Sequence, residues 1–124
     1  LTTENERTAS QRWHRDHADY KILKIFLYHN DIEEHNGSLE YIKRSHKSGK
    51  YGKIFPLKSF KKSVYPKTEE LEKYVDLDID RILATGKRYT IVFCDTYGFH
   101  RGGFVKTGER MMSHIIYTSE ANIN

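Results

Sequence analysis

Cysteine, proline and long apolar runs are all scarce in this 124-residue chain, and each scarcity excludes a class of protein. Cys94 is the only cysteine, so an intrachain disulfide framework is excluded and a reducing, cytoplasmic location is expected. No apolar run approaches the ~20 residues that cross a bilayer, so the sequence predicts no membrane span. The two prolines, Pro56 and Pro66, do not belong to a low-complexity linker. We therefore expect a single domain over residues 1–124.

The hydrophobic content is low for a domain of this length. About 36% of the residues are apolar when glycine is counted and tyrosine is not, against ~45–50% in average soluble domains. A polar-lined cavity or a missing piece of chain would explain so thin a core. Because the chain also opens at Leu1, with no initiator methionine and no signal-peptide pattern, we expect a fragment that lacks an N-terminal segment.

Positive charge is concentrated in residues 43–67, called the basic segment below. It holds nine Lys or Arg and no acid, whereas acids outnumber bases in the rest of the chain. The segment is either a solvated loop or a rim that attracts a small acidic or phosphate-bearing substrate. It contains no recognisable nucleic-acid-binding motif, so nucleic acid is not the expected partner.

The pattern of β-branched and aromatic residues predicts a mainly β protein. A tight turn at residues 35–37 would join the strands at 21–28 and 38–42 into a hairpin. One helix is predicted from Thr68 towards Gly86, although residues 75–79 also alternate as a strand would. The pattern is typical of a sandwich or barrel with one or two short helices. The predicted strands are residues 11–16, 21–28, 38–42, 89–94, 99–104 and 111–118.

Two histidines and one carboxylate are the main candidates for chemistry. His14 and Asp16 stand two residues apart, so on a strand both side chains share a face. His100 lies on a short predicted strand between glycines, where the backbone can approach a ligand closely. Two histidines and a carboxylate on one face of an Fe(II) ion form the facial triad of non-haem iron oxygenases. Arg110 opens the last strand, and its guanidinium matches a carboxylate in a bidentate manner.

These residues belong to a larger pattern that resembles the phytanoyl-CoA dioxygenase family. Members of that family are Fe(II)- and 2-oxoglutarate-dependent oxygenases built on a double-stranded β-helix, a jelly-roll or cupin-like barrel, and they are usually longer at the N-terminus. The resemblance covers residues 11–118. It depends on WHRD at 13–16, the strand at 23–28 followed by NDI at 30–32, LEYI at 39–42 with SHK at 45–47, residues 95–100, and Arg110.

The resemblance implies a role for each candidate residue. His14, Asp16 and His100 would bind Fe(II), and Arg110 would bind the distal carboxylate of 2-oxoglutarate, whose other end chelates the iron. Halogenating relatives replace the carboxylate ligand with a small residue, and because Asp16 is an acid we expect a hydroxylase that releases succinate and CO2. Ascorbate would serve as reductant. Two other readings stay open: a catalytically silent jelly-roll module that binds an anionic ligand, and a cupin-type enzyme that uses another divalent metal.

The second contact of the co-substrate is not assigned by the resemblance. Many related oxygenases have serine two residues after the arginine, and here that position is Met112; His114, in phase with Arg110, is one candidate. Lys24 lies in phase with the apolar residues of its predicted strand. If that face is interior, Lys24 needs an anionic partner, for which the co-substrate is one candidate; an outward-facing lysine is the equal alternative.

Overall fold

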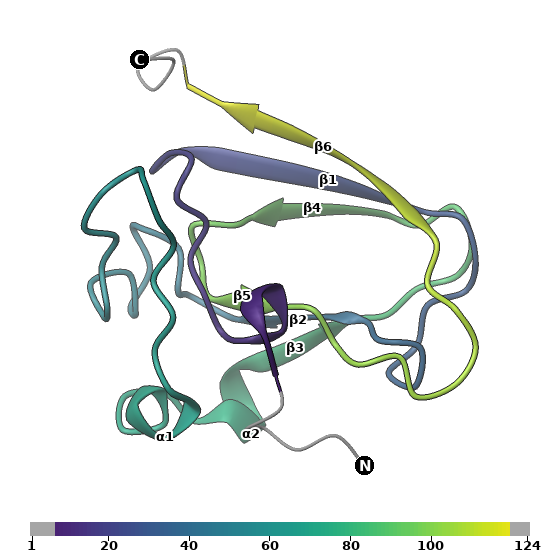
Figure 1. The fold of residues 1–124 in the computed structure, drawn as a ribbon, viewed down its shortest axis with the longest axis horizontal. Helices are drawn as coiled ribbons and strands as arrows, with labels where there is room; N and C mark the ends of the chain where they lie inside the picture. Colours follow the sequence, from purple (N-terminus) through teal and green to yellow (C-terminus); the bar gives the residue numbers. More distant parts are fainter. Residues whose placement is uncertain (1–6, 120–124) are drawn as a thin grey trace.

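Two three-stranded antiparallel sheets face each other in the computed structural model, which describes residues 7–119 (Figure 1). The first sheet has the order β4-β1-β6, and the second has the order β3-β2-β5. The strands are β1 (Ile22–Tyr28), β2 (Leu39–Ile42), β3 (Arg81–Ala84), β4 (Ile91–Asp95), β5 (His100–Arg101) and β6 (Met112–Thr118). The mainly β prediction is confirmed. Over the described residues the strands remain two separate sheets and do not close into a barrel.

The predicted hairpin between residues 21–28 and 38–42 is wrong, although both strands form. β1 lies at the centre of the first sheet and β2 at the centre of the second. The turn residues still turn the chain, because Gly37 adopts a positive φ of 83° and Asn36 accepts a hydrogen bond from the backbone of Glu33. The loop crosses to the other sheet because fully buried Ile32 exchanges two backbone hydrogen bonds with Gly86, which anchors it beside the end of β3.

The single helix predicted from Thr68 towards Gly86 is also wrong in its extent. Two one-turn helices form, α1 (Thr68–Leu71) and α2 (Leu77–Asp80), and the chain then continues as β3. The Asp76 side chain accepts hydrogen bonds from the backbone of Asp78 and Ile79, so it caps α2 and separates it from α1. Pairing with β2 then draws the following residues into a strand, in spite of their helical spacing.

Two further predicted strands are shorter than expected. Residues 9–11 form a 3-10 helix, and residues 12–16 are extended but pair only through isolated bridges, His14 with His100 and Arg15 with Val64. The predicted strand at 99–104 is reduced to β5. Both segments therefore contribute to the fold mainly by carrying the candidate site residues.

The core consists of small clusters between and beside the sheets. One cluster contains Trp13, Ile42 and Phe99, and another contains Phe26 and Tyr28 on the inner face of β1. The outer face of the first sheet is also apolar and is exposed: it includes Leu23, Ile91, Phe93, Ile115 and Tyr117. Some of the few apolar residues of the chain therefore lie outside the core. Within residues 7–119, no helix has the length and apolar composition needed to cross a membrane.

Candidate metal centre

His14 and His100 are brought together by backbone pairing between two distant segments. The backbone N–H of His14 donates to the carbonyl of His100 at 3.1 Å, and the reverse bond is 3.2 Å long. Residues that exchange both bonds in an antiparallel pair stand directly opposite each other, so their side chains leave the same face. The two imidazole rings accordingly lie 4.3 Å apart between centroids. Asp16 follows on the same extended segment, held by a 3.0 Å hydrogen bond from its backbone N–H to the Thr96 carbonyl.

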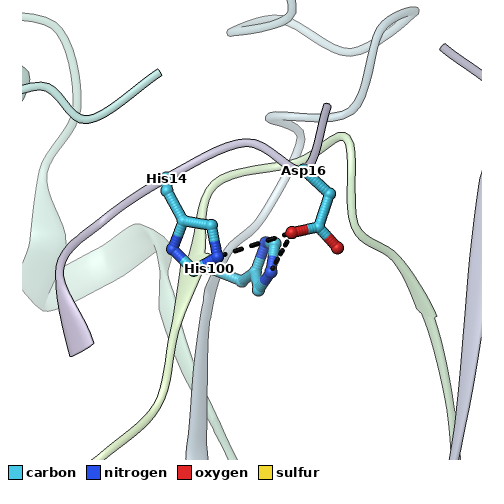
Figure 2. Close-up of side chains that lie close together, drawn as sticks. All are labelled: His14, Asp16 and His100. Carbon is cyan, nitrogen blue, oxygen red and sulfur yellow. Dashed lines mark ion pairs between the residues drawn. The ribbon is translucent and has the colours of Figure 1, made fainter. Parts of the chain in front are cut away.

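The three predicted ligands converge on one point (Figure 2). The Oδ1 atom of Asp16 lies 3.5 Å from Nε2 of His14 and 3.5 Å from Nε2 of His100. One potential ligand atom from each residue falls within 4.8 Å of the other two. Both histidines are buried, and the Asp16 side chain is 15% exposed. The structure therefore brings together the three residues that the sequence analysis singled out.

The hydrogen bonds of the imidazoles show that this cluster suits a cation. Nδ1 of His14 lies 2.7 Å from the Arg12 carbonyl, and Nδ1 of His100 lies 2.9 Å from the Gly98 carbonyl. A carbonyl oxygen only accepts, so in each ring Nδ1 carries the hydrogen and a neutral ring turns the lone pair of Nε2 towards Asp16. Three acceptor atoms then face one another, an arrangement that a shared cation relieves. Backbone acceptors behind ligating histidines are a usual feature of metal sites.

The protonation equilibria of the cluster favour the ligand forms. Burial by itself would raise the pKa of the Asp16 carboxyl, but the neighbouring His100, His14 and Lys24 side chains outweigh it, and the pKa lies well below its usual range. Burial lowers the pKa of His100, with Asp16 opposing the shift. At neutral pH Asp16 is therefore an anion and His100 is neutral, as metal coordination requires.

A small cavity opens beside the cluster. Its volume is about 380 Å³, and His14, Asp16 and Lys24 contribute to its wall. Ser63 and Tyr65 of the basic segment line it as well, and the ring of Tyr65 stacks on that of His14 with centroids 5.4 Å apart. This space is called the site cavity below. The basic segment is thus one wall of the candidate site.

Arg15, between the two ligands on the extended segment, fixes that segment to the basic segment. Its side chain is fully buried, and its guanidinium donates to six backbone carbonyls. Burial lowers the pKa of Arg15 to about 10, which leaves it charged at neutral pH. The rings of Phe99 and Tyr97 lie 3.9 Å and 4.6 Å from its guanidinium carbon. The accepting carbonyls belong to Ser45, Tyr51, Gly52, Ile54, Phe55 and Tyr97.

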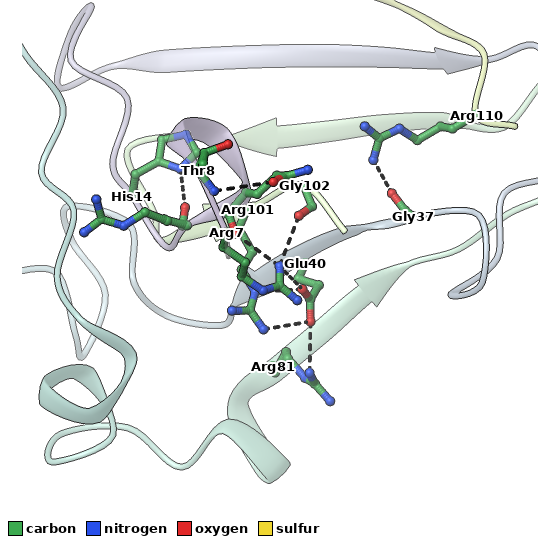
Figure 3. A network of polar contacts seen from close by, with 11 residues as sticks. Arg7, Thr8, His14, Gly37, Glu40, Arg81, Arg101, Gly102 and Arg110 are labelled. Atoms are coloured by element: carbon green, nitrogen blue, oxygen red, sulfur yellow. Dashed lines mark hydrogen bonds and ion pairs between the residues drawn. The ribbon is translucent and has the colours of Figure 1, made fainter. Parts of the chain in front are cut away.

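Arg110 lies apart from the site cavity. It precedes β6 and lies between the two sheets, where it donates a hydrogen bond to the Gly37 carbonyl (Figure 3). It is partly buried, and it is not part of the cavity wall that His14 and Asp16 help to form. His114, the other candidate for a co-substrate contact, is exposed and lies across from Phe26 of β1.

Sequence reasoning missed a second cluster of charges, centred on Glu40 (Figure 3). Glu40 is buried on β2, and Arg101 of β5 lies 2.7 Å from its carboxylate. Arg81 contacts the other oxygen at 2.9 Å, and Arg7 lies at 3.7 Å. The only signal in the sequence is that Glu40 is in phase with buried Ile42. Because the cluster ties β5 to β2 and β3, it supports the strand that carries His100.

Comparison of the sequence with protein-family models and with curated proteins finds no match. The chemistry of the site is therefore the guide to function, since a fold alone does not determine an activity.

Proposed function

We propose that this protein is an Fe(II)- and 2-oxoglutarate-dependent dioxygenase that resembles the phytanoyl-CoA dioxygenase family. It would hydroxylate a small molecule and convert 2-oxoglutarate and dioxygen to succinate and CO2. The observation that carries the proposal is the convergence of Nε2 of His14, Nε2 of His100 and Oδ1 of Asp16. Two histidines and one carboxylate are the ligand set of non-haem Fe(II) oxygenases. The proposal includes a double-stranded β-helix, to which two facing antiparallel sheets are suited.

Each residue of this chain has a defined task in the proposal. His14, Asp16 and His100 would hold the iron, which supplies the redox chemistry with dioxygen when bound. The backbone carbonyls behind both histidines orient the rings, and the burial of the rings limits access of water. Arg110 would bind the distal carboxylate of 2-oxoglutarate through its guanidinium. Ascorbate would keep the metal reduced during assays.

The basic segment favours an acidic or phosphate-bearing substrate. Its residues Ser63 and Tyr65 line the site cavity, where the reaction would take place. Lys58, Lys61 and Lys62 are exposed on it, and the segment itself contains no acid. Such a rim raises the local concentration of an anion.

Metal binding and turnover together test the proposal. Protein loaded with Fe(II) should form succinate from 2-oxoglutarate in the presence of ascorbate, at least slowly without a substrate. His14→Ala and His100→Ala should abolish both Fe(II) binding and succinate formation, because each removes one of three ligands. His35→Ala is the matched control, since this exposed histidine lies outside the cluster and should change neither quantity.

Three outcomes separate the readings of the site. Succinate formation that survives His14→Ala or His100→Ala contradicts the proposal. The alternative, a catalytically silent module that binds an anionic ligand, predicts anion binding that does not depend on Fe(II). A cupin-type enzyme would bind a divalent metal without any response to 2-oxoglutarate. An anaerobic titration of the Fe(II) protein with 2-oxoglutarate, followed by visible absorption, distinguishes them.

A further inference from the structure

Lys24 reaches the candidate metal centre from the other sheet. It lies on β1 in phase with the buried residues Ile22 and Phe26, so its side chain points to the interior. Its Nζ atom lies 2.6 Å from Oδ2 of Asp16, the carboxylate oxygen that does not face the two histidines. The side chain is only 20% exposed. The interior alternative for Lys24 is therefore the correct one, and its anionic partner is Asp16.

The contact with Asp16 uses only part of the hydrogen-bonding capacity of Lys24. An ammonium group carries three N–H donors. Among residues 7–119, Asp16 is the one hydrogen-bonding or ion-pairing partner that the structure gives to this ammonium group. A partly buried ammonium with unused donors is costly unless an acceptor reaches it. Lys24 lines the site cavity next to His14 and Asp16, so an anion bound there would supply that acceptor.

Lys24 and Arg110 lie beside different positions of the β1–β6 strand pair. Lys24 pairs with Ile116 of β6, whereas Tyr28 pairs with Met112, two residues after Arg110. Four residues of a strand span about 13 Å, so the backbones that carry the two cations are well separated. In the proposed site the two long side chains would contact opposite ends of one dicarboxylate, with Lys24 at the end next to the metal ligands.

We propose that Lys24 is a binding residue for the 2-oxo acid end of the co-substrate, the end that pyruvate shares with 2-oxoglutarate. This inference rests on the proposed function. It assigns a second co-substrate contact that Met112, in place of the serine of related oxygenases, does not provide. Lys24 also occupies Oδ2 of Asp16, which leaves Oδ1 as the oxygen available to the metal.

The experiment compares two ligands on three variants of the full chain. Binding of 2-oxoglutarate and of pyruvate is measured anaerobically on protein saturated with Fe(II), after the metal affinity of each variant has been determined. Lys24→Met should weaken both ligands ten- to hundredfold, the loss expected for one hydrogen bond to a charged group. Arg110→Met should weaken 2-oxoglutarate and leave pyruvate unchanged. Lys21→Met, an exposed neighbour outside the site cavity, should change neither.

If Lys24→Met binds both ligands as tightly as the unchanged protein, the inference is wrong and Lys24 only neutralises Asp16. A loss confined to 2-oxoglutarate also overturns it, because Lys24 would then act at the distal end. Failure of the unchanged protein to bind Fe(II) or either ligand refutes the proposed function instead. If Lys24→Met does not fold, Lys24→Gln replaces it, because glutamine keeps a donor to Asp16 without the charge. The binding of 2-oxoglutarate and of pyruvate to Lys24→Gln then tests the inference in the same way.

Discussion

Replacing Arg15 should destabilise the protein more than replacing any exposed arginine, and the structure allows the size of the loss to be worked out. A guanidinium has five N–H donors. Five carbonyl contacts of Arg15 are 3.2 Å or shorter, and a sixth, to Gly52, is 3.5 Å. The donors are thus fully used, and the side chain is 0% exposed.

The magnitude follows from the number of carbonyls that lose a donor. Arg15→Lys retains the charge but has three donors, so at least two buried carbonyls lose their partner; at about 1–3 kcal/mol each the loss is ~2–6 kcal/mol. Arg15→Met leaves all the carbonyls without this donor, but removes the cost of burying a cation, several kcal/mol. At about 1–3 kcal/mol for each of the six carbonyls the gross loss is ~6–18 kcal/mol, so after subtracting the cost of the cation we expect a net loss of at least about 3 kcal/mol for Arg15→Met, a large part of the ~5–15 kcal/mol by which a typical domain is stable.

Urea denaturation provides the measurement. Trp13 is the only tryptophan and is 1% exposed, so its fluorescence reports unfolding of the core next to Arg15. Arg12→Met is the control, because Arg12 is exposed and donates a single hydrogen bond, to the Tyr65 carbonyl at 3.2 Å; its effect should stay within about 0.5 kcal/mol. A loss below about 1 kcal/mol for Arg15→Met would refute the reasoning, since water or other donors would then satisfy the carbonyls.

Two further predictions concern buried titratable groups. Hydrogen bonds from Arg44 and Tyr51 hold the pKa of Asp80 below its usual range. The ionised carboxylate therefore stabilises the folded state at pH values above the pKa that Asp80 has in the unfolded chain. This stabilisation is lost as the pH falls through the lower pKa that Asp80 has in the folded protein. Asp80→Asn should therefore cost about 1–3 kcal/mol at pH 7, a difference that shrinks below about pH 4 in urea titrations, whereas exposed Asp78→Asn should show no such pH-dependent difference. Burial raises the pKa of the Cys94 thiol to about 12, so a thiol reagent at pH 8 should label it only as fast as the protein opens. Rapid labelling of native protein, at the rate of a free thiol, would show that the first sheet is not packed as described.

The strands and the shared face of His14 and Asp16 could be predicted because their signals are local. β-branched and aromatic residues predicted β1, β2, β4 and β6 to within two residues at each end. His14 and Asp16 share a face because the segment is extended, even though it is not a regular strand. The hairpin could not be predicted, because the choice of partner for β1 depends on β4 and β6, more than 60 residues away. The prediction of one helix towards Gly86 was wrong for the same reason, because pairing with β2 outweighed the helical spacing of Ile82 and Leu83.

The sequence by itself singled out the groups expected at the candidate site: His14, Asp16, His100 and the basic segment. Only the tertiary structure decided what each one contacts. It placed Lys24 on Asp16, surrounded Arg15 with carbonyls of the basic segment, and put Arg110 against Gly37 outside the site cavity. The physical reason is the distance along the sequence over which each property is determined. Side-chain alternation is fixed within a few residues, whereas the partner of a buried charge comes from whichever distant segment packs against it.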